Sequence, residues 1–136
     1  MLRPLLLTLL ALPAAGPSAA EDAAWPAEFA AIIASSSTLC EGFSVSPEAV
    51  SQRDLNGDGT LDWVLDTGGF ACANSYGTFC GTGGCAVETL IAGVPGSLLL
   101  HSWEIETVST TTTLTAPNRS GETVRFLWTG SEWQLQ

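Results

Sequence analysis

Oxygen-bearing side chains recur at alternate positions in the segment Asp54-Leu55-Asn56-Gly57-Asp58-Gly59-Thr60-Leu61-Asp62. Calcium is a hard cation that takes about six to eight oxygen ligands, and alternate side chains of a curled loop can point at one ion. Gly59, at the sixth position, permits the sharp turn that a side chain would resist. The spacing therefore predicts a calcium site in loop 54–62, with the ligands Asp54, Asn56, Asp58, Thr60 and Asp62.

The roles of these ligands differ. Three carboxylates so close together repel one another unless a cation lies among them. Thr60 is expected to offer its backbone carbonyl, and Asp62 a carboxylate, directly or through water. Two alternatives stay open. Magnesium tends to keep its waters and is less suited to such a loop, and Asn-Gly and Asp-Gly are also common in metal-free hairpin turns.

The loop resembles an EF-hand loop through its ninth position and then departs from it. Leu65 stands at the twelfth position, where an EF-hand supplies a bidentate glutamate, and the segment after the loop favours a strand. The pattern is more similar to the D-x-N-x-D-G-x-x-D loop of FG-GAP and VCBS-type repeats, which runs between strands. That resemblance implies a ligand role for Asp62. It covers about residues 54–66 and does not extend to a propeller, which needs several blades.

A second resemblance is to small exported bacterial proteins that combine such a loop with a Cys-Gly-Thr-Gly-Gly-Cys segment, here Cys80 to Cys85. This resemblance implies no activity. With the twelfth carboxylate missing, calcium affinity is expected to be weak, with a dissociation constant on the order of 0.1–1 mM.

The four cysteines, an even number, favour two disulfides in an exported chain. Three pairings are possible. We favour Cys40–Cys72 with Cys80–Cys85, because the glycines between Cys80 and Cys85 let the chain ends meet. A zinc site is the rival interpretation, but paired C-x-x-C motifs are absent and His101 is the only histidine.

The N-terminus has the composition of a signal peptide, which we expect to comprise residues 1–20. Arg3 precedes an apolar run, and small residues precede the expected cleavage site before Glu21. The apolar run is shorter than the roughly 20 residues of a membrane span. We therefore expect a periplasmic or secreted protein with no membrane insertion.

The charge of the chain is strongly acidic. After loss of residues 1–20, three arginines remain against fourteen carboxylates, a net charge of −11. Nucleic-acid binding requires lysines and arginines that neutralise phosphates, so this balance argues against nucleic acid. It also disfavours anionic lipid surfaces.

Hydrophobic periodicity predicts one helix followed by strands. Phe29, Ile32 and Ile33 lie at helical spacing within a helix expected over 25–39. Alternating residues predict strands over 61–67, 86–91, 98–108 and 124–128, with a turn at 93–96. A polar threonine run at 110–113 suits an exposed strand face. We expect an α+β fold, in which the N-terminal helix packs on an antiparallel β-meander in a single disulfide-stapled domain over 21–136.

The function that these patterns favour is non-enzymatic calcium binding outside the cytoplasm, with the ion in a structural role. The alternative is an interaction module, an inhibitor or envelope-binding protein that contacts a protein partner through loop 68–84. No hydrolase or phosphate-binding motif is present. A small hydrolase centred on His101 is the weakest hypothesis, because a lone histidine is usually a packed or surface residue.

Overall fold

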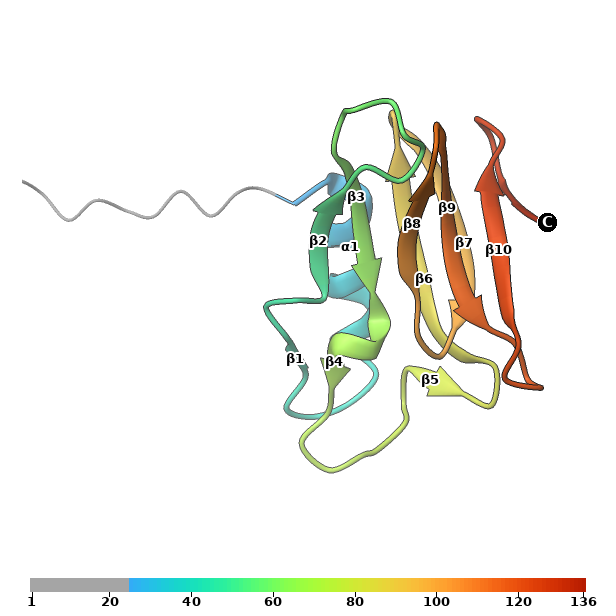
Figure 1. Cartoon of the computed structure of the whole chain (residues 1–136). Helices are drawn as coiled ribbons and strands as arrows, with labels where there is room; N and C mark the ends of the chain where they lie inside the picture. The colour runs from blue at the N-terminus through green and yellow to red at the C-terminus, as the bar shows by residue number, and fades with distance from the viewer. Residues whose placement is uncertain (1–24) are drawn as a thin grey trace, which may run out of the picture.

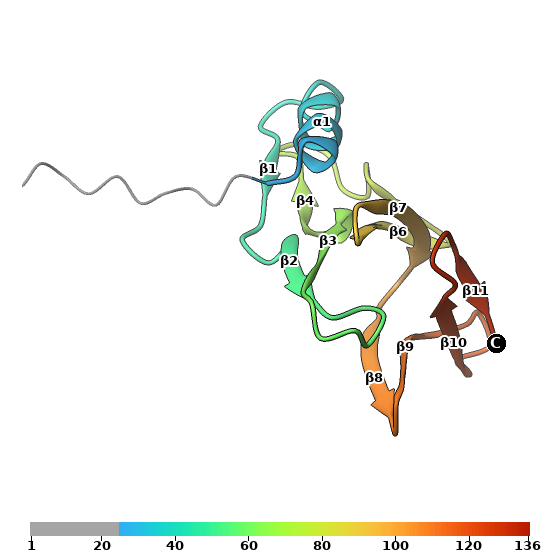
Figure 2. The same cartoon turned by 90° about the horizontal axis from the view of Figure 1, so that it is seen from above.

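The computed structural model describes residues 25–136, which form three layers (Figures 1 and 2). The expected signal peptide at 1–20 and its cleavage site before Glu21 lie outside the described residues. In chain order the elements are α1 (Ala27–Ser36), β1 (Ser44–Val45), β2 (Val50–Arg53), β3 (Asp62–Asp66), the 3-10 helix η1 (Thr67–Gly69), β4 (Phe70–Ala71), β5 (Cys80–Gly81), β6 (Gly84–Ile91), β7 (Val94–Leu100), β8 (Glu104–Val108), β9 (Thr111–Pro117), β10 (Thr123–Trp128) and β11 (Trp133–Leu135).

The strands form three antiparallel sheets. A five-stranded sheet has the order β2-β3-β6-β5, with β7 paired to the other side of β6. A four-stranded sheet has the order β11-β10-β9-β8, and β1 pairs with β4 in a small separate sheet. The helix and the small sheet lie on one side of the five-stranded sheet, and the four-stranded sheet lies on the other (Figure 2). The predicted α+β class is confirmed, but the single meander is wrong.

The segment at 98–108 explains this difference. It was expected to form one strand, but β7 ends at Leu100 and β8 begins at Glu104 in the other large sheet. Residues 101–103 carry the chain between the sheets. Both halves have strand-forming composition, so periodicity alone gives no sign of the crossing.

Each large sheet contributes to a core between them. Leu55, Val64 and Leu114 are fully buried there. A second core under α1 contains Phe29 and Leu65. β3 therefore lies between two apolar layers, since the neighbouring residues Val64 and Leu65 belong to different cores.

Three local expectations are corrected. The turn between β6 and β7 consists of Ala92 and Gly93, with φ of 49° and 80°, and not of residues 93–96. Positive φ at both central residues is the type I′ pattern of two-residue hairpins. The threonine run is only partly exposed, because Thr112 and Thr113 are buried in β9, between β8 and β10, whereas Thr110 and Thr111 are exposed. The helix is also shorter than predicted, since it ends at Ser36.

Both expected disulfides are confirmed. Cys40–Cys72 joins the segment after α1 to the segment after β4 across 32 positions, and Cys80–Cys85 joins paired residues of β5 and β6 across five. Among residues 25–136, no helix is long and apolar enough to span a bilayer.

The two disulfides should differ in their contribution to stability. A disulfide restricts the unfolded chain more when it closes a longer loop, so the loop-entropy relation gives about 3–4 kcal/mol for Cys40–Cys72 and about 2 kcal/mol for Cys80–Cys85. We expect the double variant C40S/C72S to lose more unfolding free energy in urea than C80S/C85S. Equal losses, or the reverse order, would contradict this assignment.

Candidate functional site

The predicted calcium loop joins β2 to β3, which pair from Val50–Leu65 to Arg53–Asp62. It projects beyond the ends of these strands at the top of Figure 1. Gly57 and Gly59 both have positive φ, of 78° and 83°. This left-handed conformation is open to glycine at little cost and explains both glycines of the loop.

Asp54 organises the first half of the loop. Its Oδ1 accepts a hydrogen bond from the Gly57 N–H at 2.7 Å, and its Oδ2 accepts one from the Gly59 N–H at 2.9 Å. One carboxylate therefore binds two donors that the positive φ values turn toward it. Hydrogen bonds to an ionised acceptor are the stronger kind, so Asp54 fixes the curl of the loop.

Asn56 and Asp58 continue the pattern. The Asp58 N–H donates to Asn56 Oδ1 at 3.1 Å, and the Thr60 N–H donates to Asp58 Oδ1 at 2.7 Å. Asn56 Nδ2 also donates to Asp58 Oδ2 at 3.1 Å. Each of these side chains accepts the backbone N–H two residues further on, which is the Asx-turn arrangement.

Asp62 lies at the base of the loop and is 3% exposed. Its Oδ2 accepts the Leu55 N–H at 3.0 Å, and its Oδ1 accepts the Ala92 N–H at 3.2 Å. The same carboxylate thus binds the start of the loop and the turn between β6 and β7. A buried carboxylate needs such donors, because its transfer from water is costly.

The loop also contacts the opposite sheet. Leu55 is fully buried in the core between the large sheets. A Cβ added at Gly57 would lie 2.7 Å from Thr112 Oγ1 of β9, so the backbone approaches that strand closely. The loop is therefore a bridge between the two large sheets as well as a hairpin connection.

The five predicted ligands lie in one loop, but their carboxylates do not form a ready-made cage. Within residues 25–136, no three histidine, cysteine, aspartate or glutamate side chains are placed to hold a metal ion. The carboxylates of Asp54, Asp58 and Asp62 point at N–H donors instead. Asn56 and the Thr60 carbonyl complete the predicted set, and the calcium site remains a prediction.

The charge of this loop is not balanced by neighbouring cations. Arg53 precedes it, but its guanidinium lies over the Trp103 ring, 5.8 Å from the ring centre. The ion pair found in the described part of the chain joins Arg125 to Glu106 at 3.3 Å. Three carboxylates within nine residues thus have only neutral N–H donors as partners.

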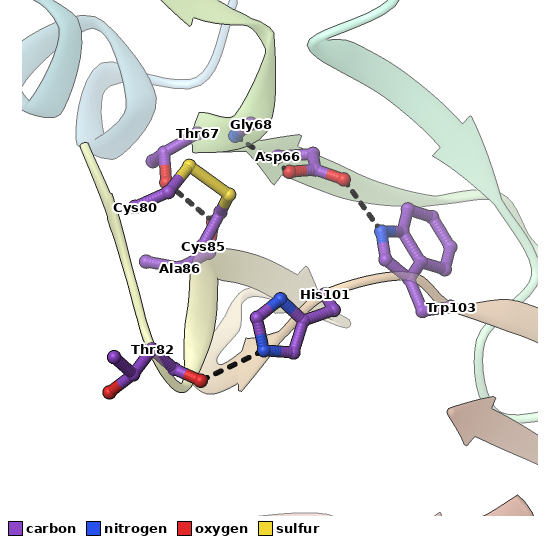
Figure 3. Close-up of a disulfide and its surroundings, with 9 residues drawn as sticks. All are labelled: Asp66, Thr67, Gly68, Cys80, Thr82, Cys85, Ala86, His101 and Trp103. Atoms are coloured by element: carbon purple, nitrogen blue, oxygen red, sulfur yellow. Dashed lines mark hydrogen bonds between the residues drawn. A yellow bond between two sulfur atoms is a disulfide. The ribbon is translucent and has the colours of Figure 1, made fainter. Parts of the chain in front are cut away.

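The other end of β3 carries a second aspartate, shown in Figure 3. Asp66 Oδ1 accepts the Gly68 N–H at 2.8 Å, and Asp66 Oδ2 accepts Trp103 Nε1–H at 2.8 Å. This carboxylate therefore holds η1 and the chain that crosses between the sheets.

His101 lies near the Cys80–Cys85 disulfide (Figure 3) and is exposed. Its Nε2 is 2.9 Å from the Thr82 carbonyl oxygen. A carbonyl only accepts, so Nε2 carries the proton. Nowhere in residues 25–136 does a serine or cysteine side chain bond this ring, and the hydrolase hypothesis gains no support.

The segment at 68–84, expected to be an irregular contact loop, contains the end of η1 and all of β4 and β5. Phe70 and Phe79 pack edge to face with Phe43 and with each other in the core under α1. Tyr76 is fully exposed. Of the three aromatic side chains in this segment, Tyr76 is therefore the one available to a protein partner. The role of the segment as an interaction module stays a prediction.

Comparison with known proteins finds no family model, curated protein or solved structure that matches this chain. The resemblance to FG-GAP and EF-hand loops therefore stands on the residues of the loop alone.

The Asp62 carboxylate should contribute strongly to the stability of the fold. In Asp62→Ala, the N–H groups of Leu55 and Ala92 lose their charged acceptor inside the protein. We expect a loss of about 2–5 kcal/mol in unfolding free energy, measured by urea denaturation with chelator present. The exposed control Glu104→Ala should change it by less than about 0.5 kcal/mol. An Asp62→Ala variant as stable as the control would show that these hydrogen bonds do not hold the loop.

Proposed function

We propose that this protein is an extracytoplasmic calcium-binding protein in which the ion has a structural role in loop 54–62. Its two disulfides support export, because disulfides persist in oxidising compartments. The acidic composition suits a protein that attracts cations.

One observation carries the proposal: the carboxylates of Asp54, Asp58 and Asp62 lie in nine residues without a cationic partner among the described residues. Bringing these three like charges toward one point would raise the energy of the loop. A bound divalent cation would remove that repulsion, and no other described group is placed to do so.

The hydrogen bonds of the loop do not use all of its acceptor capacity. Each carboxylate oxygen of Asp54, Asp58 and Asp62 accepts one N–H in this structure. A carboxylate offers about four lone-pair sites on its two oxygens, so each oxygen keeps acceptor capacity. The N–H bonds orient the side chains and are compatible with coordination by the remaining lone pairs.

The expected ligands are the side chains of Asp54, Asn56 and Asp58 and the Thr60 carbonyl, with Asp62 binding directly or through water. When bound, calcium supplies positive charge and a centre for hard oxygen ligands. Leu55 lies between two of these residues and is fully buried. An ion that orders the loop would therefore also hold Leu55 in the core.

The proposal predicts that calcium stabilises the protein. An ion that binds only the folded state adds about 1.4 kcal/mol at ten times its dissociation constant. For a domain of this size we expect a rise of about 3–8 °C in melting temperature, measured by circular dichroism with calcium against chelator. Magnesium at equal concentration should give a smaller rise.

The matched variants are Asp58→Asn and Glu122→Gln. Asp58→Asn keeps an acceptor for the Thr60 N–H but removes one charge, so the calcium-dependent rise should fall by at least half. Glu122 lies in the exposed turn after β9, where it accepts Asn118 Nδ2–H at 3.0 Å, and Glu122→Gln should keep the full rise. Identical melting with calcium and with chelator in the unsubstituted protein would refute the proposal.

A further inference from the structure

A cavity lies at the ends of β7 and β9 that are remote from loop 54–62. Its volume is about 450 Å³, within the range of small-molecule sites. The ends of β7 and β9, the start of β10 and the last strand β11 form its walls, together with the turn at Gly83. It therefore opens where the two large sheets meet at one edge.

The walls of this cavity are mainly apolar. Leu99 and Leu135 both line it, and they are 60% and 59% exposed. The half-buried Phe126 and the buried Leu100 line the same walls. Two large aliphatic side chains left in solvent on one concave surface mark a place where an apolar ligand would gain burial energy.

Among the polar residues that line the cavity, none is negatively charged. Arg119 lines it, and no aspartate or glutamate is among its ten lining residues. Arg53 is stacked on Trp103 and Arg125 is paired with Glu106. Among the arginines of residues 25–136, only Arg119 makes no ion pair, side-chain hydrogen bond or ring contact within that part of the chain.

The neighbours of Arg119 leave its charge available. Glu122 is in the same turn, but its carboxylate accepts a hydrogen bond from Asn118 at 3.0 Å. His101 forms another part of the wall, and its hydrogen bond to the Thr82 carbonyl fixes the ring. The guanidinium of Arg119 always carries its proton, so Arg119 is the group suited to an anion.

We propose that this cavity binds an aliphatic monocarboxylate, with the hydrocarbon chain against Leu99, Phe126 and Leu135 and the carboxylate on Arg119. The apolar walls would bury the chain, and a guanidinium can bind a carboxylate through two parallel hydrogen bonds. The local positive charge of Arg119 should favour an anionic head group over a neutral or cationic one, against the net negative charge of the rest of the protein. This inference is independent of the calcium proposal.

The test is a titration of the ¹⁵N-labelled protein with octanoate, octan-1-ol and octylammonium in calcium-free buffer, followed by amide shifts. We expect octanoate to shift the amides of Leu99, His101, Arg119 and Leu135 saturably, and to bind about tenfold more tightly than octan-1-ol. Octylammonium should bind more weakly than either. Absence of saturable shifts at these residues, or equal affinity for octanoate and octylammonium, overturns the proposal.

Two variants distinguish the contribution of the Arg119 charge to binding from that of the apolar walls. Arg119→Gln should lose about tenfold in octanoate affinity and keep its affinity for octan-1-ol, whereas Leu99→Gln should weaken both. Arg125→Gln, which removes an exposed arginine paired elsewhere, should change neither. An Arg119→Gln variant that binds octanoate as tightly as the unsubstituted protein rules out the assigned carboxylate site. Unchanged melting of these surface variants shows that the fold is intact.

Discussion

The rest of the structure depends on the hydrogen bonds that two carboxylates accept, one at each end of β3. Asp62 binds the Leu55 and Ala92 N–H groups, and Asp66 binds the Gly68 N–H and the Trp103 indole. A strand between two apolar cores has few other polar contacts by which distant segments can be fixed. These four hydrogen bonds connect β3 to its own entry loop, to the turn between β6 and β7, and to the chain that crosses between the sheets.

Loop 54–62, the candidate calcium site, also contributes to the stability of the folded protein. The oxygen-rich loop contributes Leu55 to the core and approaches Thr112 on the opposite sheet. Any ligand that orders the loop therefore acts on the packing between both large sheets. The apolar cavity beside Arg119 is lined by residues at the other ends of strands of the same sheets. The two proposed sites thus share a scaffold but no residues.

Much of the candidate site and part of the fold could be predicted from the sequence. The loop could be located because glycine at positive φ and short oxygen side chains have local causes. The glycines between Cys80 and Cys85 favoured that disulfide, which left Cys40 to pair with Cys72. The sheet arrangement could not be predicted from the sequence. The hydrophobic pattern of residues 98–108 predicts one strand, whereas in the structure residues 101–103 connect strands of two different sheets. The roles of Leu55, Ala92 and Trp103 were also missed. An apolar residue between two loop oxygens was the available signal for Leu55, whereas the contacts of Ala92 and Trp103 join residues 30 and 37 positions apart.

The central claim is that a divalent cation occupies the loop and is held by its oxygens. The most direct measurement is a calcium titration followed by the amide resonances of Gly57 and Gly59, whose N–H groups both bind Asp54. The account predicts that both shift together, saturably, with a dissociation constant on the order of 0.1–1 mM. If both resonances stay unchanged up to roughly ten times that range, calcium does not bind this loop.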